Sequence, residues 1–385
     1  MKLVFLSNFF NHHQKFVSDE LYGILGNDYV FVETEEVPED KIQLGYHQYK
    51  EPYVLRYNVD TKDYIDKLIL EADIVHFGEA PVGLIKKRVS EGKLVVRDDE
   101  RRYKSLIKYL KWPIYTYNSL FFNNGLLLCS SAFAPRDYLL SGMKPSHCYK
   151  WGYFPEIREY SDIHKIIRAK RENIGLKQLD VSILWVARLI GLKHPEAAIF
   201  VAKRLVSDGI KFEMNIIGIG LLESKIKRLI HENGLSEYVH MLGSMSPEGV
   251  RDYMEKSDIF LFTSDQNEGW GATLNESMNS GCAVVAGHLI GSVPFLLKDG
   301  ENGMIFKSKN WNHLYEKVKW LVYHKEQREE MGVRAYKTLL NEWSPKVAAR
   351  NLVAFYIAKL KGKETPFLEG PCSKAQVIGY NWMRK

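Results

Sequence analysis

Two carboxylates, Glu268 and Glu276, lie on either side of a glycine-rich turn with seven residues between them. Residues 272–279 after the glycines have a helical composition, and apolar runs at 258–263 and 282–286 have the length of buried parallel strands. Ligands bind at the carboxyl ends of strands in an open α/β sheet, where a helix start offers free N–H groups to an anion. The pattern therefore predicts a strand, a ligand-binding loop and a helix. The alternative is that both carboxylates are solvated acids at a helix start.

The segment 264–281 resembles the signature of glycosyltransferase family four, in which a Glu, seven residues and a second Glu frame a Gly-aromatic-Gly turn. The resemblance implies that Glu268 holds hydroxyls of the transferred sugar and that Glu276 holds the ribose hydroxyls of its nucleotide. A carboxylate suits both roles because it accepts two hydroxyl hydrogen bonds at once, and small glycines let backbone N–H groups approach a sugar. The backbone that would contact the donor is that of Gly269, Trp270, Gly271, Ala272 and Thr273.

Arg188 and Lys193 follow another apolar run, 181–187. They resemble the family's strand-to-helix loop that grips the donor diphosphate, so both are candidate catalytic residues. A rigid guanidinium and a mobile ammonium can together neutralise the charge on a departing nucleoside diphosphate. Taken alone, an Arg and a Lys five residues apart are only weak evidence for a diphosphate-binding site. The same resemblance places further residues beside the donor, in the turns after the next two strands: Gly218, Gly220, Ser244 and Met245.

A polar loop, residues 7–14, is predicted after the N-terminal strand and contains His12 and His13. The Gly-x-Gly-x-x-Gly pattern of dinucleotide enzymes is absent from it. In family four this loop faces the sugar nucleotide, so His13 is a candidate catalytic residue that contacts the sugar or the acceptor. The alternative is a surface loop histidine with no part in the reaction.

The composition bounds the class of protein. The 385 residues suffice for two domains with sizeable cores, and 26% charged with 45% hydrophobic residues excludes disordered and fibrous classes. The four cysteines lack paired spacing, which argues against a disulfide framework or a zinc site and indicates a reducing compartment. No signal peptide is predicted and no apolar run has the length of a membrane span, so any membrane contact is expected to be peripheral.

Positive charge is concentrated between residues 86 and 111, where there are ten Lys or Arg residues and four acids. Residues 103–112 combine aromatics, aliphatics and lysines in a helical pattern, which is typical of a helix that rests on an anionic bilayer or a lipid phosphate. The alternative is an amphipathic helix packed on its own domain. The acidic run at 98–100 also leaves open a metal-dependent transferase of the GT-A fold.

Family-four resemblance implies the α/β GT-B fold: two Rossmann-like domains facing each other across a cleft, with a C-terminal helix that returns to the first domain. We expect residues 1–160, completed by 346–385, to form an N-terminal acceptor-side domain, and residues 161–345 to form a nucleotide-sugar-binding domain. The span 35–64 has no clear pattern. Strands are predicted at residues 2–6, 29–33, 73–77, 93–97, 126–129, 181–187, 212–217, 239–242, 258–263, 282–286 and 304–306.

The predicted function is transfer of a hexose from a nucleotide sugar, such as a UDP- or GDP-sugar, to a glycan or lipid-linked glycan, with retention of anomeric configuration. The run Lys150 to Pro155 resembles bacterial enzymes that build surface polysaccharides, so we expect a cytoplasmic protein at the inner face of the membrane. No metal, other cofactor or nucleic-acid partner is expected. The alternatives are a nucleotide-sugar epimerase of the same fold and a non-catalytic subunit of a glycan-synthesis complex.

Overall fold

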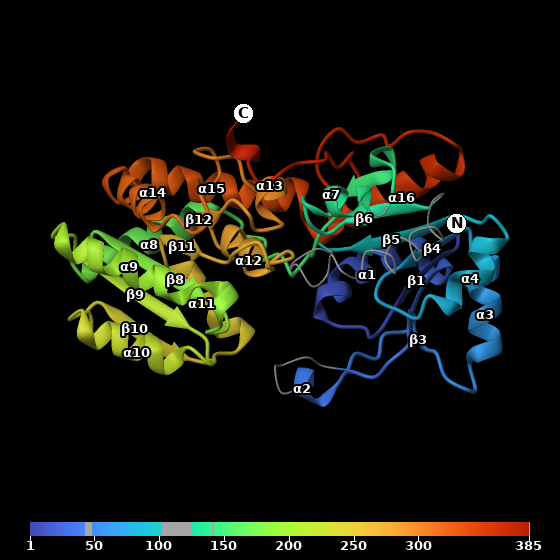
Figure 1. Cartoon of the computed structure of the whole chain (residues 1–385), viewed down its shortest axis with the longest axis horizontal. Coiled ribbons are helices and arrows are strands. Elements are labelled where there is room, and N and C mark those ends of the chain that lie inside the picture. Colours follow the sequence, from blue (N-terminus) through green and yellow to red (C-terminus); the bar gives the residue numbers. More distant parts are fainter. Residues whose placement is uncertain (43–47, 102–124, 141, 385) are drawn as a thin grey trace. The chain divides into compact units, whose positions relative to one another are not determined.

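The computed structural model describes residues 1–42, 48–101, 125–140 and 142–384, and they form two compact units (Figure 1). Unit 1 comprises Met1–Glu156 with Glu342–Lys385, and unit 2 comprises Ile157–Asn341. The domain boundaries predicted above lie a few residues later in the chain. Each unit has its own parallel sheet, as expected of a Rossmann-like domain.

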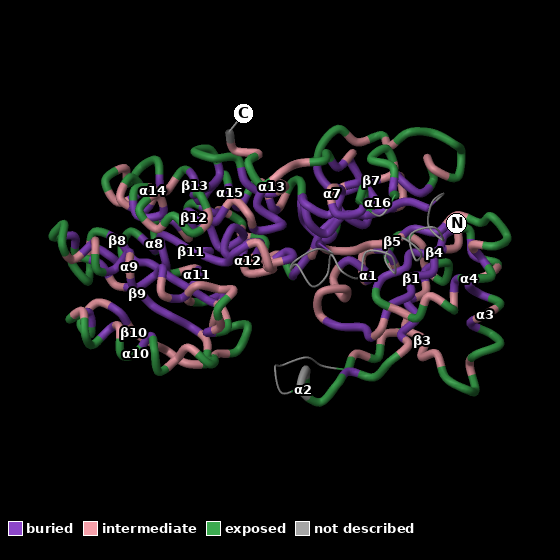
Figure 2. Tube along the Cα trace, viewed as in Figure 1, coloured by how far each residue is buried: buried purple, intermediate pink, exposed green. Residues whose placement is uncertain are grey.

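Within the described residues, unit 1 has a seven-stranded sheet in the order β3-β2-β1-β4-β5-β6-β7. Parallel strands require crossover connections, and helices supply most of them here. β1, β4 and β6 are buried along their whole length (Figure 2), which explains why their sequences are mostly apolar. The strands are β1 (Leu3–Ser7), β2 (Tyr29–Glu33), β3 (Val54–Arg56), β4 (Ile74–Phe77), β5 (Val95–Asp99), β6 (Leu126–Cys129) and β7 (Cys148–Lys150). The helices are α1 (His12–Leu25), α2 (Glu39–Ile42), α3 (Lys62–Glu71), α4 (Gly83–Ser90), α7 (Ala134–Leu139) and α16 (Pro345–Leu360).

Helix α1 begins earlier than the sequence pattern predicts. The Asn11 side chain accepts a hydrogen bond from the His13 backbone N–H at 2.8 Å and so caps the first turn. His12 and His13 therefore belong to the first turn of α1, and the prediction that they lie in a loop is wrong.

The C-terminal segment completes unit 1. Ser344 caps α16, which packs on α1, so the prediction that this helix returns to the first domain is confirmed. Beyond α16, the backbone N–H of Cys372 donates to the Lys150 carbonyl at 2.8 Å, and Lys374 forms an antiparallel bridge with Tyr149. The tail thus covers the free edge of β7, which would otherwise expose unpaired backbone groups.

Unit 2 has a six-stranded parallel sheet, within the described residues, in the order β10-β9-β8-β11-β12-β13. β8, at the centre, is buried on both faces, and α9, α10 and α14 share one apolar core with the sheet. The strands are β8 (Val181–Val186), β9 (Phe212–Ile217), β10 (Val239–Gly243), β11 (Ile259–Phe262), β12 (Ala283–Gly287) and β13 (Met304–Phe306). The helices are α8 (Ile163–Leu176), α9 (Pro195–Ser207), α10 (Glu223–Glu232), α11 (Pro247–Lys256), α12 (Thr273–Asn279), α13 (Val293–Leu296), α14 (Trp311–Tyr323) and α15 (Lys325–Glu342).

None of the helices in the described part of the chain combines the length and apolar character that crossing a membrane requires.

Candidate functional site

The predicted site residues of unit 2 gather at one edge of its sheet. β8 and β11 are hydrogen-bonded neighbours, although 72 residues separate Val186 from the start of β11 at Ile259 in sequence order. Because the strands are parallel, the loops that follow them leave the sheet side by side at their carboxyl ends. The loop after β8 carries Arg188 and Lys193, and the loop after β11 carries Glu268.

Hydrogen bonds join these two loops rigidly. The Thr263 hydroxyl donates to the Lys193 carbonyl at 2.6 Å and accepts from the Trp185 indole N–H at 2.8 Å. Asp265 contributes a backbone bond, from its N–H to the Leu192 carbonyl at 3.0 Å. The indole and hydroxyl are buried, so leaving either bond unmade would cost about 1 to 3 kcal/mol. The loops are therefore held as one preformed surface.

Lys193 and Glu268 form an ion pair across the two loops. Their side chains are only 15% and 12% exposed, so solvent screens this pair less than a surface salt bridge. The family resemblance implies separate roles for these residues, with Lys193 on the diphosphate and Glu268 on the sugar. The structure brings the two charged groups together at one point.

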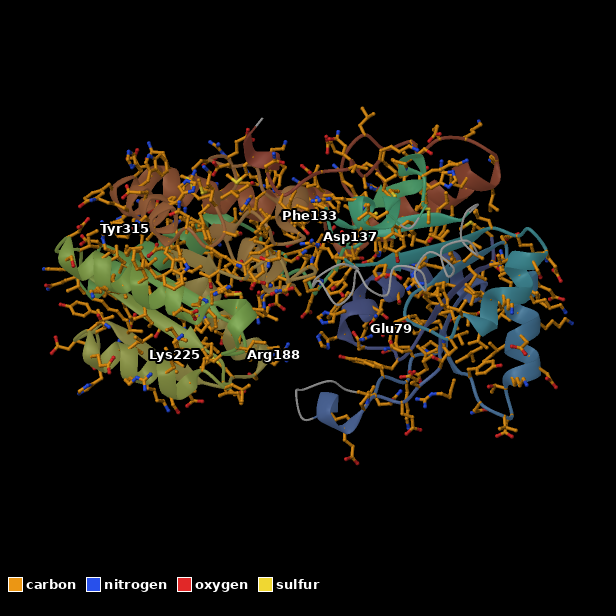
Figure 3. The ribbon with its side chains drawn as sticks, viewed as in Figure 1. Glu79, Phe133, Asp137, Arg188, Lys225 and Tyr315 are labelled. Carbon is orange, nitrogen blue, oxygen red and sulfur yellow. The ribbon has the colours of Figure 1, made fainter. Side chains whose placement is uncertain are left out.

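Arg188 extends from the end of β8 and is exposed (Figure 3). Among the described residues it has no ion-pair or hydrogen-bond partner through its side chain, unlike Lys193. An exposed guanidinium without an internal partner keeps its donors for a ligand. Its backbone, by contrast, is tightly enclosed.

Two glycines enclose that backbone. Gly218 and Gly220 follow β9 with φ values of 138° and 156°, and a Cβ added to Gly218 would lie 1.9 Å from the Ala187 carbonyl oxygen. Hydrogen bonds link the same segments, from Leu189 N–H to the Ile219 carbonyl at 2.9 Å. These glycines thus allow the β9 loop to pack directly on the segment that carries Arg188. Direct contact between the glycines and a donor stays a prediction.

We expect Gly218→Ala to shift this segment and lower the free energy of unfolding by roughly 2 to 4 kcal/mol, because the methyl group overlaps a backbone atom at a positive φ. Urea denaturation of the two proteins measures the change. Gly234→Ala is the control, since Gly234 also has a positive φ but its Cβ would meet nothing within 4 Å. A loss in Gly218→Ala no greater than in the control would contradict this packing argument.

Two residues of the glycine turn after β11, Trp270 and Gly271, pack against the interior of unit 2. Trp270 is fully buried, and its indole N–H donates to Asn275 at 2.9 Å, so the indole cannot reach a ligand. Gly271 has a φ of 84°, and a Cβ there would lie 2.3 Å from the Phe262 ring. Any donor contact from this turn must come from its backbone. Such contacts by Gly269, Ala272 and Thr273 stay predictions.

Glu276 lies in the first turn of α12 and is partly buried. Burial raises the pKa of its carboxyl, and the nearby charge of Arg251 opposes that rise. The predicted contact of Glu276 with ribose hydroxyls is not tested by this geometry. The same holds for Ser244 and Met245, which follow β10 at the carboxyl edge of the sheet.

His194 is a site residue that the sequence did not reveal. Its Nε2 lies 3.3 Å from Asp265 Oδ2 and its Nδ1 lies 3.4 Å from Glu196 Oε1. Both ring nitrogens face carboxylates, so both must carry protons. Hydrogen bonds to Asp265 and then to Glu196 raise the pKa of His194 to about 9. His194 also has a φ of 48°, unusual for a residue other than glycine. A locked imidazolium thus directly follows Lys193.

We expect this imidazolium to make stability depend on pH. Because the pKa of His194 is raised to about 9 from 6.5, its contribution is complete below pH 6.5 and is lost as the pH rises through about 9. His194→Asn keeps a side chain that tolerates this φ but removes the titrating group. Between pH 6.5 and 9.5, wild type should lose roughly 1 to 3 kcal/mol more than His194→Asn in denaturant unfolding. Parallel pH curves would refute the assignment.

Unit 1 has a pocket of its own, with a volume of about 700 Å³, at the carboxyl ends of β1, β4, β5 and β6. His13 lines it and stacks on Tyr153 with ring centroids 5.1 Å apart. Burial, and then the charge of His12, lower the pKa of His13 to about 3. His13 is therefore neutral near pH 7 and is suited to hydrogen bonding rather than to carrying a proton. Its contact with a sugar or an acceptor stays a prediction.

The acidic run 98–100, at the end of β5, is not arranged as a joint metal site in the part of the chain that the structure describes. Asp99 pairs with Arg97 at 3.0 Å, Glu100 accepts from the Tyr153 hydroxyl at 2.6 Å, and Asp98 lies against His76. The three carboxylates thus have separate partners.

The structure describes only the first part of the basic tract 86–111, up to residue 101. Residues 102–111, with the predicted interfacial helix at 103–112, lie outside the described residues. In the described part, Arg88 is 1% exposed and donates to the carbonyls of Ile69, Ala72 and Leu94. The Arg101 side chain is also enclosed, between the rings of Phe133 and Tyr380. Internal acceptors and rings take up the guanidinium groups of these two arginines, so their charges do not face solvent. The predicted peripheral membrane contact stays a prediction.

Comparison with known proteins shows what the sequence of unit 2 is similar to. Residues 167–338 match the model of the family described as "Glycosyl transferases group 1". The match lies within unit 2 and covers less than half of the chain. The matched range contains Arg188, Lys193, His194, Glu268 and Glu276.

Parts of the chain are similar to curated proteins, among them one named for bacterial polysaccharide biosynthesis. The chain is 33% identical over 144 residues to the amylovoran biosynthesis glycosyltransferase AmsK of Erwinia amylovora, covering 35% of each chain. It is 31% identical over 176 residues to an N-acetylgalactosaminyltransferase of Campylobacter jejuni that acts on a diphospho-undecaprenol-linked sugar, covering 46% of this chain and 45% of that one. The matches thus span less than half the length of these relatives.

Solved structures share the fold of most of the chain. Anabaena HepE in complex with UDP has a TM-score of 0.68 at 13% identity, and the match covers 93% of this chain and 100% of HepE. The lipopolysaccharide outer core galactosyltransferase WaaB, in its apo form, has a TM-score of 0.67 at 15% identity with the same coverage. The predicted GT-B class, with two Rossmann-like α/β domains, is confirmed, and the GT-A alternative is excluded.

Proposed function

We propose that this protein is a glycosyltransferase that moves a sugar from a nucleotide sugar to a hydroxyl of a glycan. One observation carries the proposal: the loops after β8 and β11 bring Arg188 and the Lys193–Glu268 pair to the same edge of the sheet of unit 2. A sugar diphosphate combines two negative phosphates with a ring of hydroxyls. The site offers cations for the first and a carboxylate for the second.

Each charged group has a separate task in this proposal. Arg188, exposed and without an internal ion pair among the described residues, binds the diphosphate and stabilises it as it departs. Lys193 shares that charge while its pairing with Glu268 fixes both side chains. Glu268 accepts hydrogen bonds from hydroxyls of the transferred sugar, and Glu276 from those of the ribose. The imidazolium of His194 adds a fixed positive charge beside Lys193.

We infer a UDP-sugar as the first donor to test, because HepE, which shares the fold, has been solved with UDP and with UDP-glucose. GDP-sugars are the second class of donor to test. The named activities of the relatives from Erwinia and Campylobacter support a glycan or lipid-linked glycan acceptor in polysaccharide synthesis. A lipid-linked acceptor would bring this protein to the inner membrane face as a peripheral protein. Retention of configuration and independence from metal follow from the family-four resemblance.

Two measurements test the function. UDP at 100 times its dissociation constant should raise the apparent stability of the protein by about 2.7 kcal/mol in thermal unfolding, and GDP serves as the comparison. UDP release from UDP-glucose, UDP-galactose and UDP-N-acetylglucosamine should then increase when octyl glycosides are added as acceptors. The increase should persist when EDTA removes metal ions. An epimerase would instead change the sugar and release UDP without regard to the glycoside. Absence of both a UDP-induced shift and UDP release would overturn the proposal.

A further inference from the structure

Asp265 ties together the two loops of unit 2 that carry the Lys193–Glu268 pair. It lies in the loop after β11, shortly before Glu268, and is buried. Its backbone N–H donates to the Leu192 carbonyl, next to Lys193, at 3.0 Å. Its carbonyl accepts from the Glu268 N–H at 3.1 Å, and its Oδ1 accepts from the Asn267 N–H at 2.8 Å. One residue therefore holds both the loop that carries Lys193 and the turn that carries Glu268.

The other carboxylate oxygen of Asp265, Oδ2, faces His194. His194 Nε2 lies 3.3 Å from it, and His194 Nδ1 lies 3.4 Å from Oε1 of Glu196 in the first turn of α9. Burial opposes ionisation of Asp265, but hydrogen bonds from His194 and Asn267 outweigh it and lower the pKa of this carboxyl. The bond from His194 lowers the pKa of Glu196, and the charge of Lys225 on α10 adds to that effect. Both partners of the imidazole are thus ionised carboxylates near pH 7.

The number of protons on His194 decides whether both of these bonds exist. An imidazolium has two N–H groups, whereas a neutral ring has one, and its other nitrogen is an acceptor. A carboxylate only accepts, so loss of the proton places a lone pair opposite either Asp265 or Glu196. The hydrogen bonds to Asp265 and then to Glu196 raise the pKa of His194 to about 9, so the ring is charged near pH 7. At higher pH the connection from α9 to the β11 loop is lost at one end.

The other side of the glycine turn is held by groups that do not titrate near neutral or mildly basic pH. The Gly291 N–H, after β12, donates to the Glu268 carbonyl at 3.3 Å. The Ser292 hydroxyl donates to the Trp270 carbonyl at 2.6 Å. These bonds keep the turn folded when His194 loses its proton. The expected change is therefore in where the side chains of the β8 and β11 loops lie, and not in the fold of unit 2.

We propose that His194 is a positioning residue for donor binding: when protonated and bonded to Asp265 and Glu196, it holds Lys193 and Glu268 where they meet the diphosphate and the sugar. This rests on the proposed glycosyl transfer. It stands within unit 2, to which all five residues belong. His194 makes and breaks no bond of the substrate in this role. The affinity for a sugar nucleotide should consequently fall as the pH rises through about 9.

The first test measures the Kd of UDP-glucose by titration calorimetry for wild type and His194→Asn at pH 7.0 and 9.5. Asn tolerates the positive φ of this position but cannot carry the charge. At pH 7.0 binding should be about tenfold weaker in His194→Asn, the usual size of a lost charge-assisted hydrogen bond. At pH 9.5, where about three quarters of the wild-type rings are neutral, the difference should narrow to about threefold. Changes in the charge of the nucleotide cancel in this ratio, because both proteins bind the same ligand.

Three variants serve as matched comparisons. His194→Arg has N–H groups for both carboxylates and a charge that does not titrate in this range, so it should recover part of the affinity and lose the pH dependence. His240→Asn removes an imidazole of β10 that lies 3.9 Å from Glu213, and it should bind as wild type does. Asp265→Asn keeps an oxygen for the Asn267 N–H but not the charge. It should weaken binding as His194→Asn does, and the double variant should bind no more weakly than either single one.

The outcomes separate this inference from the proposed function. A ratio of Kd values that is the same at both pH values, or Kd values within twofold at pH 7.0, would overturn the inference and leave the proposed function intact. A lower Tm of His194→Asn with unchanged affinity would do the same, because His194 would then serve the fold alone. If wild type binds neither UDP nor UDP-glucose at pH 7.0, the proposed function fails, and this inference with it.

Discussion

Replacing Arg188 with alanine is expected to lower kcat/KM for UDP release about 100- to 1,000-fold, with Tm unchanged. The size is that of removing one preorganised donor from a developing negative charge. Arg188 is exposed and is not ion-paired within the described residues, so its loss leaves no internal group without a partner. Folding should therefore be unaffected while the departing diphosphate loses its main cation. Steady-state kinetics with thermal unfolding on the same samples measures both quantities.

Two further variants serve as controls for the Arg188→Ala measurement. Arg228→Ala removes another exposed arginine of unit 2, one that lies 3.8 Å from Glu232 on α10, and should leave kcat/KM unchanged. Arg188→Lys keeps the charge but not the planar fork, and should fall between wild type and Arg188→Ala. Equal activity in Arg188→Ala and Arg228→Ala would remove Arg188 from the mechanism.

The buried strands were predictable because a strand covered on both faces leaves a continuous apolar run. The predicted strands at 29–33, 126–129, 212–217 and 304–306 have the bounds of β2, β6, β9 and β13. β3 was missed, since Val54–Arg56 is a three-residue edge strand with half-buried side chains and lies in the span that had no clear pattern. Short edge strands depend on a neighbouring strand rather than on their own periodicity.

The site was only partly predictable for a different reason. Glu268 could be located because the glycine turn that surrounds it is local in sequence. Its pairing with Lys193 joins residues 75 positions apart. Such pairs depend on which strands become neighbours, and no spacing along the chain expresses that. His194 was missed for the same reason, because one of its two carboxylates, Asp265, comes from the β11 loop.

The second large effect concerns the Lys193–Glu268 pair. We expect Glu268→Gln and Lys193→Met each to lower kcat/KM for UDP release about 100- to 1,000-fold, since each removes a charged group that contacts the donor in the proposed mechanism. Each should also lower the free energy of unfolding, because the partner left behind is a largely buried charge without its counter-ion. UDP-release kinetics and urea denaturation measure the two effects.

The double variant distinguishes the two effects. Removing both charges eliminates the unpaired one, so the double variant should be more stable than the sum of the single losses predicts, by about 1 to 3 kcal/mol. Activity should not recover with stability, since neither the sugar hydroxyls nor the diphosphate regains its contact. If transfer were restored in the double variant, the pair would be a structural salt bridge, and the groups that bind the donor would have to be sought elsewhere along this edge of the sheet.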